Sequence, residues 1–229
     1  MSEEEEKVYK TVLLGEMGVG KTCIIAQFIN NSFDPDSITT SSMQFSKKII
    51  EFPDNKSVNF HIYDTAGQES FRSMARIFYK SAQVVLLVYD ITRLKSFQEI
   101  KEYWYNEVKQ ICDKNIILAI VANKNDLYER RQVEDEEGEK FAKNIGAIFA
   151  STSAKDDMGI TALFENIGQY ILNPKREKID KRNTFSITTR KTFGNIEEFK
   201  EKRRKRCCFI QYFLLFMLTI ISFILIILF

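Results

Sequence analysis

The octapeptide Gly-Glu-Met-Gly-Val-Gly-Lys-Thr at residues 15–22 constrains the fold more than any other part of the chain. It fits the phosphate-binding loop pattern G-x-x-x-x-G-K-[S/T] at every required position. An apolar run, Val8–Leu14, precedes it, and an amphipathic stretch at residues 23–28 follows. Such a loop needs this context, because the N–H groups that open the helix form the anion site. The sequence therefore predicts a strand, a loop and a helix here, and with them an α/β fold.

The fixed positions of the loop pattern have expected roles in binding phosphate or its metal ion. Gly18 and Gly20 allow the backbone to wrap around phosphate oxygens, and Lys21 adds a positive charge at the outer phosphates. The Thr22 hydroxyl is a predicted ligand of Mg²⁺. The alternative is a chance glycine-rich turn, which the flanking strand and helix patterns argue against. The predicted phosphate-binding residues of the loop are Gly15, Gly18, Val19, Gly20, Lys21, Thr22 and Cys23.

Strand and helix patterns alternate along the chain up to residue 172. The apolar runs at residues 84–89 and 116–122 predict fully buried strands, as in a sheet that is covered on both faces. Residues 43–52 and 57–63 predict two strands joined by the turn cluster Pro-Asp-Asn-Lys. Further helices are predicted at residues 72–80, 96–111, 134–144 and 159–172. The predicted fold is a doubly wound α/β sheet, mostly parallel with one antiparallel strand, which binds ligands at the carboxyl ends of its strands.

The bound base is indicated by two tetrapeptides, Asn-Lys-Asn-Asp at residues 123–126 and Thr-Ser-Ala-Lys at residues 152–155. A carboxylate such as Asp126 accepts two hydrogen bonds, from N1–H and N2–H₂ of guanine. Adenine offers no such pair, so a site built this way rejects it. The second tetrapeptide supplies a backbone donor for the guanine oxygen. Either one alone is compatible with an ordinary polar loop, but their order after two successive strands favours guanine recognition.

Charge divides the chain into parts. The whole chain holds 33 Lys and Arg against 31 Asp and Glu, yet residues 175–206 alone hold 13 basic and 5 acidic residues, which leaves the rest with a net charge of −6. A mildly acidic domain with a basic arm suits an anionic membrane surface and not nucleic acid. The predicted parts are a flexible acidic N-terminus at residues 1–7, a domain at 8–172, a flexible basic linker at 173–206 and a membrane-anchoring tail at 207–229.

Together the phosphate loop, Asp-Thr-Ala-Gly-Gln at residues 64–68 and the two base-binding tetrapeptides resemble the motifs of small Ras-like GTPases. Residues 70–74, 78–80 and 86–92 resemble segments of the Rab branch, as does a cysteine pair after a basic arm. The resemblance covers roughly residues 7–172. It implies a P-loop GTPase domain with a six-stranded sheet and five helices, monomeric, with GTP and GDP as ligands and Mg²⁺ as cofactor.

The resemblance also implies roles for single residues. Gln68 would orient the attacking water as the catalytic residue, and the Gly67 amide would contact the γ-phosphate. Asp64 would hold Mg²⁺ through water. The Thr40 hydroxyl would reach Mg²⁺ only while the γ-phosphate is present, which makes it the switch threonine. The implied metal-binding residues are Thr22, Thr40 and Asp64, and the implied guanine-binding residues are Phe33, Asn123, Lys124, Asp126, Ser153, Ala154 and Lys155.

Two features depart from the Rab pattern. Ser41 and Ser42 replace the usual Ile-Gly after the switch threonine, and Tyr63 replaces a common tryptophan before Asp64, so the surface offered to effectors is unusual. Met17 replaces the small or polar residue that Rabs often carry inside the phosphate loop. Its bulk near the γ-phosphate predicts slow intrinsic hydrolysis; the alternative is that the side chain points outward.

The carboxyl end combines Cys207-Cys208, directly after five basic residues, with an almost purely apolar stretch at residues 209–229. The cysteine pair resembles a Rab terminus that receives two geranylgeranyl groups, and two lipids with a polybasic run suffice for stable anchoring. About twenty apolar residues also suffice to span a bilayer. A third interpretation is that Gln211 represents a stop codon that was read as glutamine, so that the residues after it come from an untranslated region of the RNA. All three place the protein at the cytoplasmic face of a membrane.

The predicted function is a GTP-binding and GTP-hydrolysing Rab-like switch of vesicle traffic. Its expected partners are an exchange factor, a GTPase-activating protein, effectors and a membrane. The alternative is a GTP-locked membrane scaffold with little turnover, against which the intact Gln68 argues. A metabolic P-loop kinase is a distant third, since the guanine-type tetrapeptide contradicts it.

Overall fold

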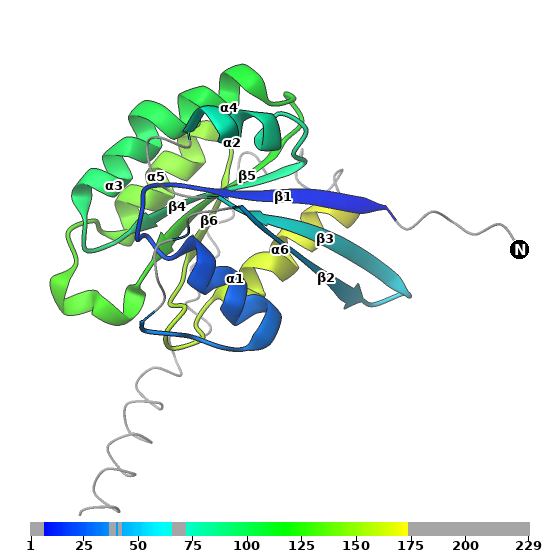
Figure 1. The fold of residues 1–229 in the computed structure, drawn as a ribbon, viewed down its shortest axis with the longest axis horizontal. Helices are drawn as coiled ribbons and strands as arrows, with labels where there is room; N and C mark the ends of the chain where they lie inside the picture. The colour runs from blue at the N-terminus through cyan, green and yellow to red at the C-terminus, as the bar shows by residue number, and fades with distance from the viewer. Residues whose placement is uncertain (1–6, 37–39, 41–42, 66–71, 174–229) are drawn as a thin grey trace, which may run out of the picture. The chain divides into compact units, whose positions relative to one another are not determined.

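A six-stranded sheet forms the centre of the computed structural model, which describes residues 7–36, 40, 43–65 and 72–173 (Figure 1). Its strands lie in the order β2-β3-β1-β4-β5-β6, and β2 is antiparallel to β3 whereas the other neighbours are parallel. The predicted doubly wound sheet with one antiparallel strand is therefore confirmed. The strands are β1 (Val8–Leu14), β2 (Gln44–Phe52), β3 (Lys56–Asp64), β4 (Val84–Asp90), β5 (Ile117–Asn123) and β6 (Ile148–Ser151).

Helices cover both faces of this sheet (Figure 1). One face carries α1 (Lys21–Asn30) and α6 (Ile160–Leu172). The other carries α2 (Arg72–Tyr79), α3 (Leu94–Glu99), α4 (Tyr105–Ile111) and α5 (Asp135–Ile145). The helix predicted over residues 96–111 is continuous but includes a π-helical turn, η2 (Ile100–Trp104), between α3 and α4. A short 3₁₀ segment, η3 (Asn125–Arg130), follows β5. Within the part of the chain that the structure describes, no helix is long and apolar enough to cross a membrane.

Strand β4 shows why the sheet is buried on both sides. Successive side chains of a strand point to opposite faces. Val85, Leu87 and Tyr89 accordingly join the cluster under α3 to α5, whereas their neighbours Val84, Leu86 and Val88 join the cluster under α1 and α6. All of them are fully buried. Because β4 is apolar on both faces, the sheet needs a layer of helices on each side to bury it.

Helix α2 is tied to α4 by one buried carboxylate. Glu107 accepts two hydrogen bonds from the Arg76 guanidinium, at 2.8 and 2.6 Å, and a third from the Tyr79 hydroxyl at 3.0 Å. Glu107 and Tyr79 are both buried. Burial and the neighbouring carboxylate raise the pKa of Tyr79, so its proton stays on the ring oxygen. The contact fixes the helix that follows residues 66–71, the segment that contains Gln68.

We expect Glu107→Ala to lower the free energy of unfolding by about 1–3 kcal/mol, because it leaves the buried Tyr79 hydroxyl without its acceptor. Urea unfolding followed by circular dichroism measures this loss. The matched control is Glu102→Ala, an exposed position in the adjoining η2 segment. Equal stabilities of the two variants would show that the buried contact does not hold α2.

Candidate functional site

A cavity of about 460 Å³ lies at the carboxyl edge of the sheet. The loops after β1, β5 and β6 and the segment after α1 form its walls, as expected for a doubly wound sheet. It brings together most of the predicted binding residues, which lie far apart in the sequence. Its lining consists of Met17, Gly18, Gly20, Lys21, Thr22, Cys23, Phe33, Asp34, Pro35, Thr40, Thr65, Asn123, Lys124, Asp126, Leu127, Ala154 and Lys155.

The phosphate loop turns in a way that requires glycine. Gly18 and Gly20 have φ angles of 75° and 95°, in the left-handed region. A Cβ on Gly20 would also collide with the side-chain amide of Asn123. That amide donates a hydrogen bond to the Val19 carbonyl at 2.8 Å, so the loop after β5 holds the loop after β1 in place. Asn123 was predicted to bind guanine; its amide here braces the phosphate loop, and it also lines the cavity.

Lys21 is buried, with 5% of its surface exposed, and opens helix α1. Its ammonium donates to the carbonyls of Gly15 and Glu16, both at 2.9 Å. Burial lowers the pKa of Lys21 to about 8, while the negative charge of Asp64 acts in the opposite direction. The loop thus holds a cation whose charge is only partly compensated. Phosphate oxygens are the chemical group that would compensate it.

Thr22, Thr40 and Asp64 form a cluster of oxygen ligands next to the loop. The Thr22 hydroxyl donates to Asp64 Oδ2 at 2.6 Å and lies 2.6 Å from the Thr40 hydroxyl. The other carboxylate oxygen, Asp64 Oδ1, is buried and has no hydrogen-bond partner among the described residues. Burial raises the pKa of Asp64, and the Thr22 hydrogen bond opposes this.

This donor set fits Mg²⁺, a hard cation that takes oxygen ligands and keeps several waters. A cation would satisfy Asp64 Oδ1 and offset the cost of a buried carboxylate. Groups of three or more His, Cys, Asp or Glu that could hold a metal do not occur among the described residues. The ion would therefore need two hydroxyls, one carboxylate and oxygens from the bound phosphates.

The predicted base-binding residues are arranged around Asp126. Its Oδ1 accepts a hydrogen bond from the Ser153 hydroxyl at 2.7 Å, which orients the carboxylate. Ala154 and Lys155 line the cavity from the loop after β6, and Phe33, with 36% of its surface exposed, lines it from the segment after α1. Lys124 has a left-handed backbone with φ of 67°, and its ammonium contacts Asp90 at 2.7 Å.

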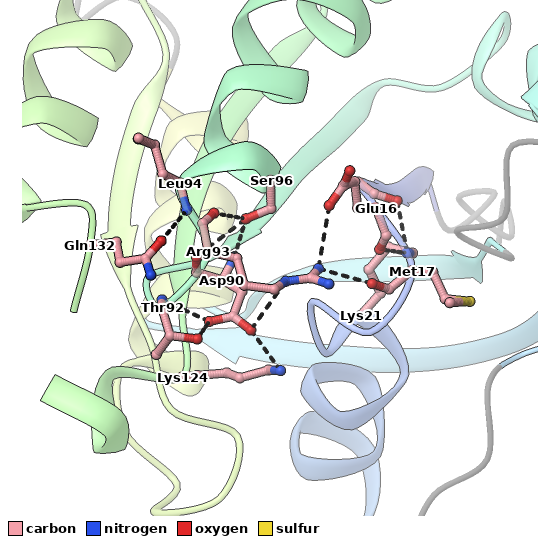
Figure 2. A network of polar contacts seen from close by, with 11 residues as sticks. Glu16, Met17, Lys21, Asp90, Thr92, Arg93, Leu94, Ser96, Lys124 and Gln132 are labelled. Carbon is pink, nitrogen blue, oxygen red and sulfur yellow. Dashed lines mark hydrogen bonds and ion pairs between the residues drawn. The ribbon is translucent and has the colours of Figure 1, made fainter. Parts of the chain in front are cut away.

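Sequence patterns missed several residues of this region. Asp34, Pro35 and Leu127 line the cavity without belonging to a predicted motif, and Thr65, from the motif at residues 64–68, lines it without having been given a role. Asp90 and Arg93 link the phosphate loop to the base-binding loop from the end of β4, as Figure 2 shows. Asp90 lies in the segment at residues 86–92 that resembles the Rab branch, but no role was predicted for it. The sequence did contain a signal for Asp90: a carboxylate that directly follows the apolar run at residues 84–89, which predicts a buried strand.

Some predicted residues lie outside this description. Gly67, Gln68, Cys207 and Cys208 fall outside the described residues, so their roles stay predictions. The Met17 side chain is 48% exposed at the rim of the cavity. Four predicted site residues that the structure describes do not line the cavity, but each is hydrogen-bonded to a residue that does: Gly15 to Lys21, Val19 to Asn123, Asp64 to Thr22 and Ser153 to Asp126. A Cβ at Gly15 would collide with the Val88 carbonyl.

Fold and site together define a P-loop nucleotide-binding domain with a guanine-type base pocket. The Ras family model matches residues 10–173. The GTP-binding protein ypt2 of Schizosaccharomyces pombe is 36% identical over 199 residues, which cover 87% of this chain and 95% of ypt2. The chain therefore belongs to the Ras family, in the Rab branch that its motifs resemble. Ras-family GTPases generally use Mg²⁺, in agreement with the oxygen cluster at Asp64.

Proposed function

We propose that this protein is a Rab-type switch that binds GTP and GDP in the 460 Å³ cavity, hydrolyses GTP and regulates vesicle traffic. Family membership supports GTP hydrolysis and a role as a switch. The observation that carries the assignment of the site is that Lys21, Thr22, Thr40 and Asp126 line one cavity. Behind them, Asp64 accepts a hydrogen bond from Thr22, and Ser153 donates one to Asp126.

The hydrolysis step follows from the charges of the site. Lys21 and the amides of the phosphate loop would stabilise negative charge on the outer phosphates in the transition state. Gln68 would orient the attacking water, and Gly67 would hold the γ-phosphate through its amide. Mg²⁺, when bound at Thr22, Thr40 and Asp64, would neutralise charge on the phosphate oxygens. Burial of Lys21 and Asp64 strengthens the electrostatic interactions that these two residues make.

The switch would act through Thr40. Its hydroxyl contacts Thr22 at 2.6 Å, so Thr40 joins the metal cluster from a different segment of the chain. Loss of the γ-phosphate would remove the ligand that keeps Thr40 at the cluster, and it would release the segment around Thr40 together with the one after Gly67.

A single-turnover assay tests this proposal. Full-length protein in detergent is loaded with GTP, and Mg²⁺ is then added. We expect GDP to accumulate with Mg²⁺ and not with EDTA, and a Gln68→Leu variant to retain GTP. A wild-type protein that binds GTP but leaves it intact would contradict the switch and support the GTP-locked scaffold.

Aromatic side chains at the β2–β3 edge offer a surface for effectors. Phe45 is 52% exposed, and its ring lies 5.2 Å from the ring of Tyr63, which in turn lies 6.5 Å from Phe78 on α2. These residues flank the segments that contain Thr40 and Gln68, so a partner bound there would sense the nucleotide. Their exposed apolar area suits a protein partner. Exchange factors and activating proteins are further expected partners of this region.

We propose that the carboxyl end attaches the protein to the cytoplasmic face of a membrane, through lipids on Cys207 and Cys208 or through residues 209–229. The Rab branch supports membrane association in general.

Imaging of an amino-terminally tagged protein distinguishes the two anchors. Deletion of residues 209–229 disperses a protein that is anchored by the tail, whereas Cys207→Ser with Cys208→Ser disperses one that is anchored by lipids. Intact-mass measurement shows whether the native chain ends at Phe229. A protein that stays dispersed in the wild type would contradict membrane attachment.

Met17 gives a kinetic prediction for the proposed site. Its side chain lies at the rim of the cavity, where bulk would crowd the γ-phosphate and an incoming catalytic group. We expect Met17→Gly and Met17→Ala to hydrolyse GTP about two- to tenfold faster in single turnover, a barrier change of about 0.4–1.4 kcal/mol. GDP dissociation, measured in parallel, should stay unchanged. Unaltered hydrolysis in both variants would show that Met17 points outward and does not limit the reaction.

A further inference from the structure

Arg93 reaches from the end of β4 to the phosphate loop without lining the cavity among the described residues (Figure 2). Its guanidinium donates a hydrogen bond to the Met17 carbonyl at 2.9 Å and lies 3.5 Å from the Glu16 carboxylate. On its other side it lies 3.6 Å from Asp90 Oδ2. One side chain thus contacts two consecutive residues of the loop and a buried carboxylate of the sheet.

The backbone of Arg93 is firmly held, which allows its side chain to act as a brace. Its N–H donates to the Asp90 carbonyl at 3.0 Å, and its carbonyl accepts from the amide and the hydroxyl of Ser96, at 3.0 and 2.7 Å. Asp90 is itself fixed by Thr92, whose amide and hydroxyl donate to Oδ1 at 2.8 and 2.7 Å. The guanidinium therefore projects from a rigid turn at the end of a buried strand.

We propose that Arg93 is a positioning residue for the phosphates: it fixes the Met17–Gly18 peptide so that the Gly18 N–H faces the phosphate site. This peptide is trans, so its C=O and N–H point in opposite directions. The C=O points to Arg93. The N–H therefore points away from Arg93, and Gly18 is part of the cavity wall. The inference rests on the proposed function and adds a residue to the same site.

The loop needs such a brace because Gly18 does not orient this peptide by itself. Gly18 has open space where a Cβ would be and a left-handed φ of 75°, so its own backbone prefers no single orientation. Neighbouring parts of the loop have fixed partners: the Val19 carbonyl accepts a hydrogen bond from the Asn123 amide, and the Gly15 carbonyl accepts one from the Lys21 ammonium. Arg93 supplies the corresponding contact at Met17.

Charge gives arginine a second role that lysine would fill poorly. Glu16 and Asp90 lie on either side of the guanidinium, with 17% and 2% of their side chains exposed. Left uncompensated, both carboxylates would repel phosphate. A planar guanidinium has donors on several edges and can serve a carbonyl and two carboxylates together, whereas an ammonium is a single point charge. Lys124 shares Asp90 at 2.7 Å, so this carboxylate has two cationic neighbours.

Nucleotide affinity of the full-length protein in detergent tests the proposal. The variants are Arg93→Ala, Arg93→Lys and a matched control, Arg130→Ala, at an exposed position at the end of η3. Competition with a fluorescent GDP analogue gives Kd for GDP and for GMP. We expect Arg93→Ala to weaken GDP about tenfold and GMP hardly at all, because GMP lacks the outer phosphate. Arg93→Lys should lie between, and the control should match wild type. The ³¹P resonance of the bound β-phosphate should shift in Arg93→Ala and not in the control.

Three results would overturn the proposal. Unchanged GDP affinity together with unchanged hydrolysis in Arg93→Ala would mean that the loop needs no brace. Equal losses for GDP and GMP would place the effect on the base loop or on folding in general. Slower hydrolysis with unchanged GDP affinity would make Arg93 a directly catalytic group. A wild-type protein that binds neither nucleotide would overturn the proposed function itself, which separates the two failures.

Discussion

Lys21→Ala is expected to weaken GDP and GTP binding about 100-fold or more. The wild-type ammonium is buried and held by two carbonyls, with a pKa lowered to about 8 by burial. The cation is thus placed in advance, and phosphate supplies the charge that it lacks. Fluorescent-GDP binding measures the loss.

The control for Lys21 is Lys95→Ala, an exposed lysine on α3. Its affinity for GDP should equal that of the wild type. Without nucleotide, the two variants should unfold at similar temperatures, so that the loss of GDP affinity in Lys21→Ala does not come from a loss of stability. If Lys21→Ala still bound GDP within about tenfold of wild type, the cavity would not bind phosphate through this loop.

Asp126→Asn is expected to reverse the base preference of the site. The carboxylate, oriented by Ser153 at 2.7 Å, would accept two hydrogen bonds from guanine. An asparagine amide offers one acceptor and one donor group. Xanthine has an acceptor oxygen where guanine has its N2 amine, so the variant matches xanthine. We expect GDP affinity to fall about 100-fold or more and XDP to become the tighter ligand.

Competition of GDP and XDP against a fluorescent nucleotide measures this reversal. The control is Asp113→Asn, in the exposed turn before the amino end of β5, at the opposite edge of the sheet from the cavity. A loss of affinity for both nucleotides in Asp126→Asn would indicate local unfolding and would contradict base reading by this carboxylate.

The fold was accessible from the sequence because its signals are local. Apolar runs marked β4 and β5 as buried strands, the cluster at residues 53–56 marked the turn between β2 and β3, and the loop at residues 15–22 fixed a strand-to-helix junction. Strand order was predicted less fully, as a mostly parallel sheet with one antiparallel strand. The π-helical turn in η2 has no local signal in this chain and was missed.

The candidate site could also be predicted from the sequence in part. Motif residues that share one edge of a parallel sheet must converge, and Lys21, Thr22, Thr40 and Asp126 do line one cavity. Contacts between motifs were not accessible. Nothing in Asn-Lys-Asn-Asp says that Asn123 bonds the Val19 carbonyl, and nothing around Arg93 says that it reaches Met17. These contacts join residues 104 and 76 positions apart.

The sequence alone determined the ligand class and the topology class of this protein, because glycine, lysine and threonine at fixed spacing set the backbone and charge of the loop directly. Only the tertiary structure decided how the loop is held. The Met17–Gly18 peptide is oriented by Arg93, and the Glu107 carboxylate holds α2. Both depend on which strands and helices become neighbours. Spacing can specify a motif, but side chains distant in sequence meet only when the sheet has formed.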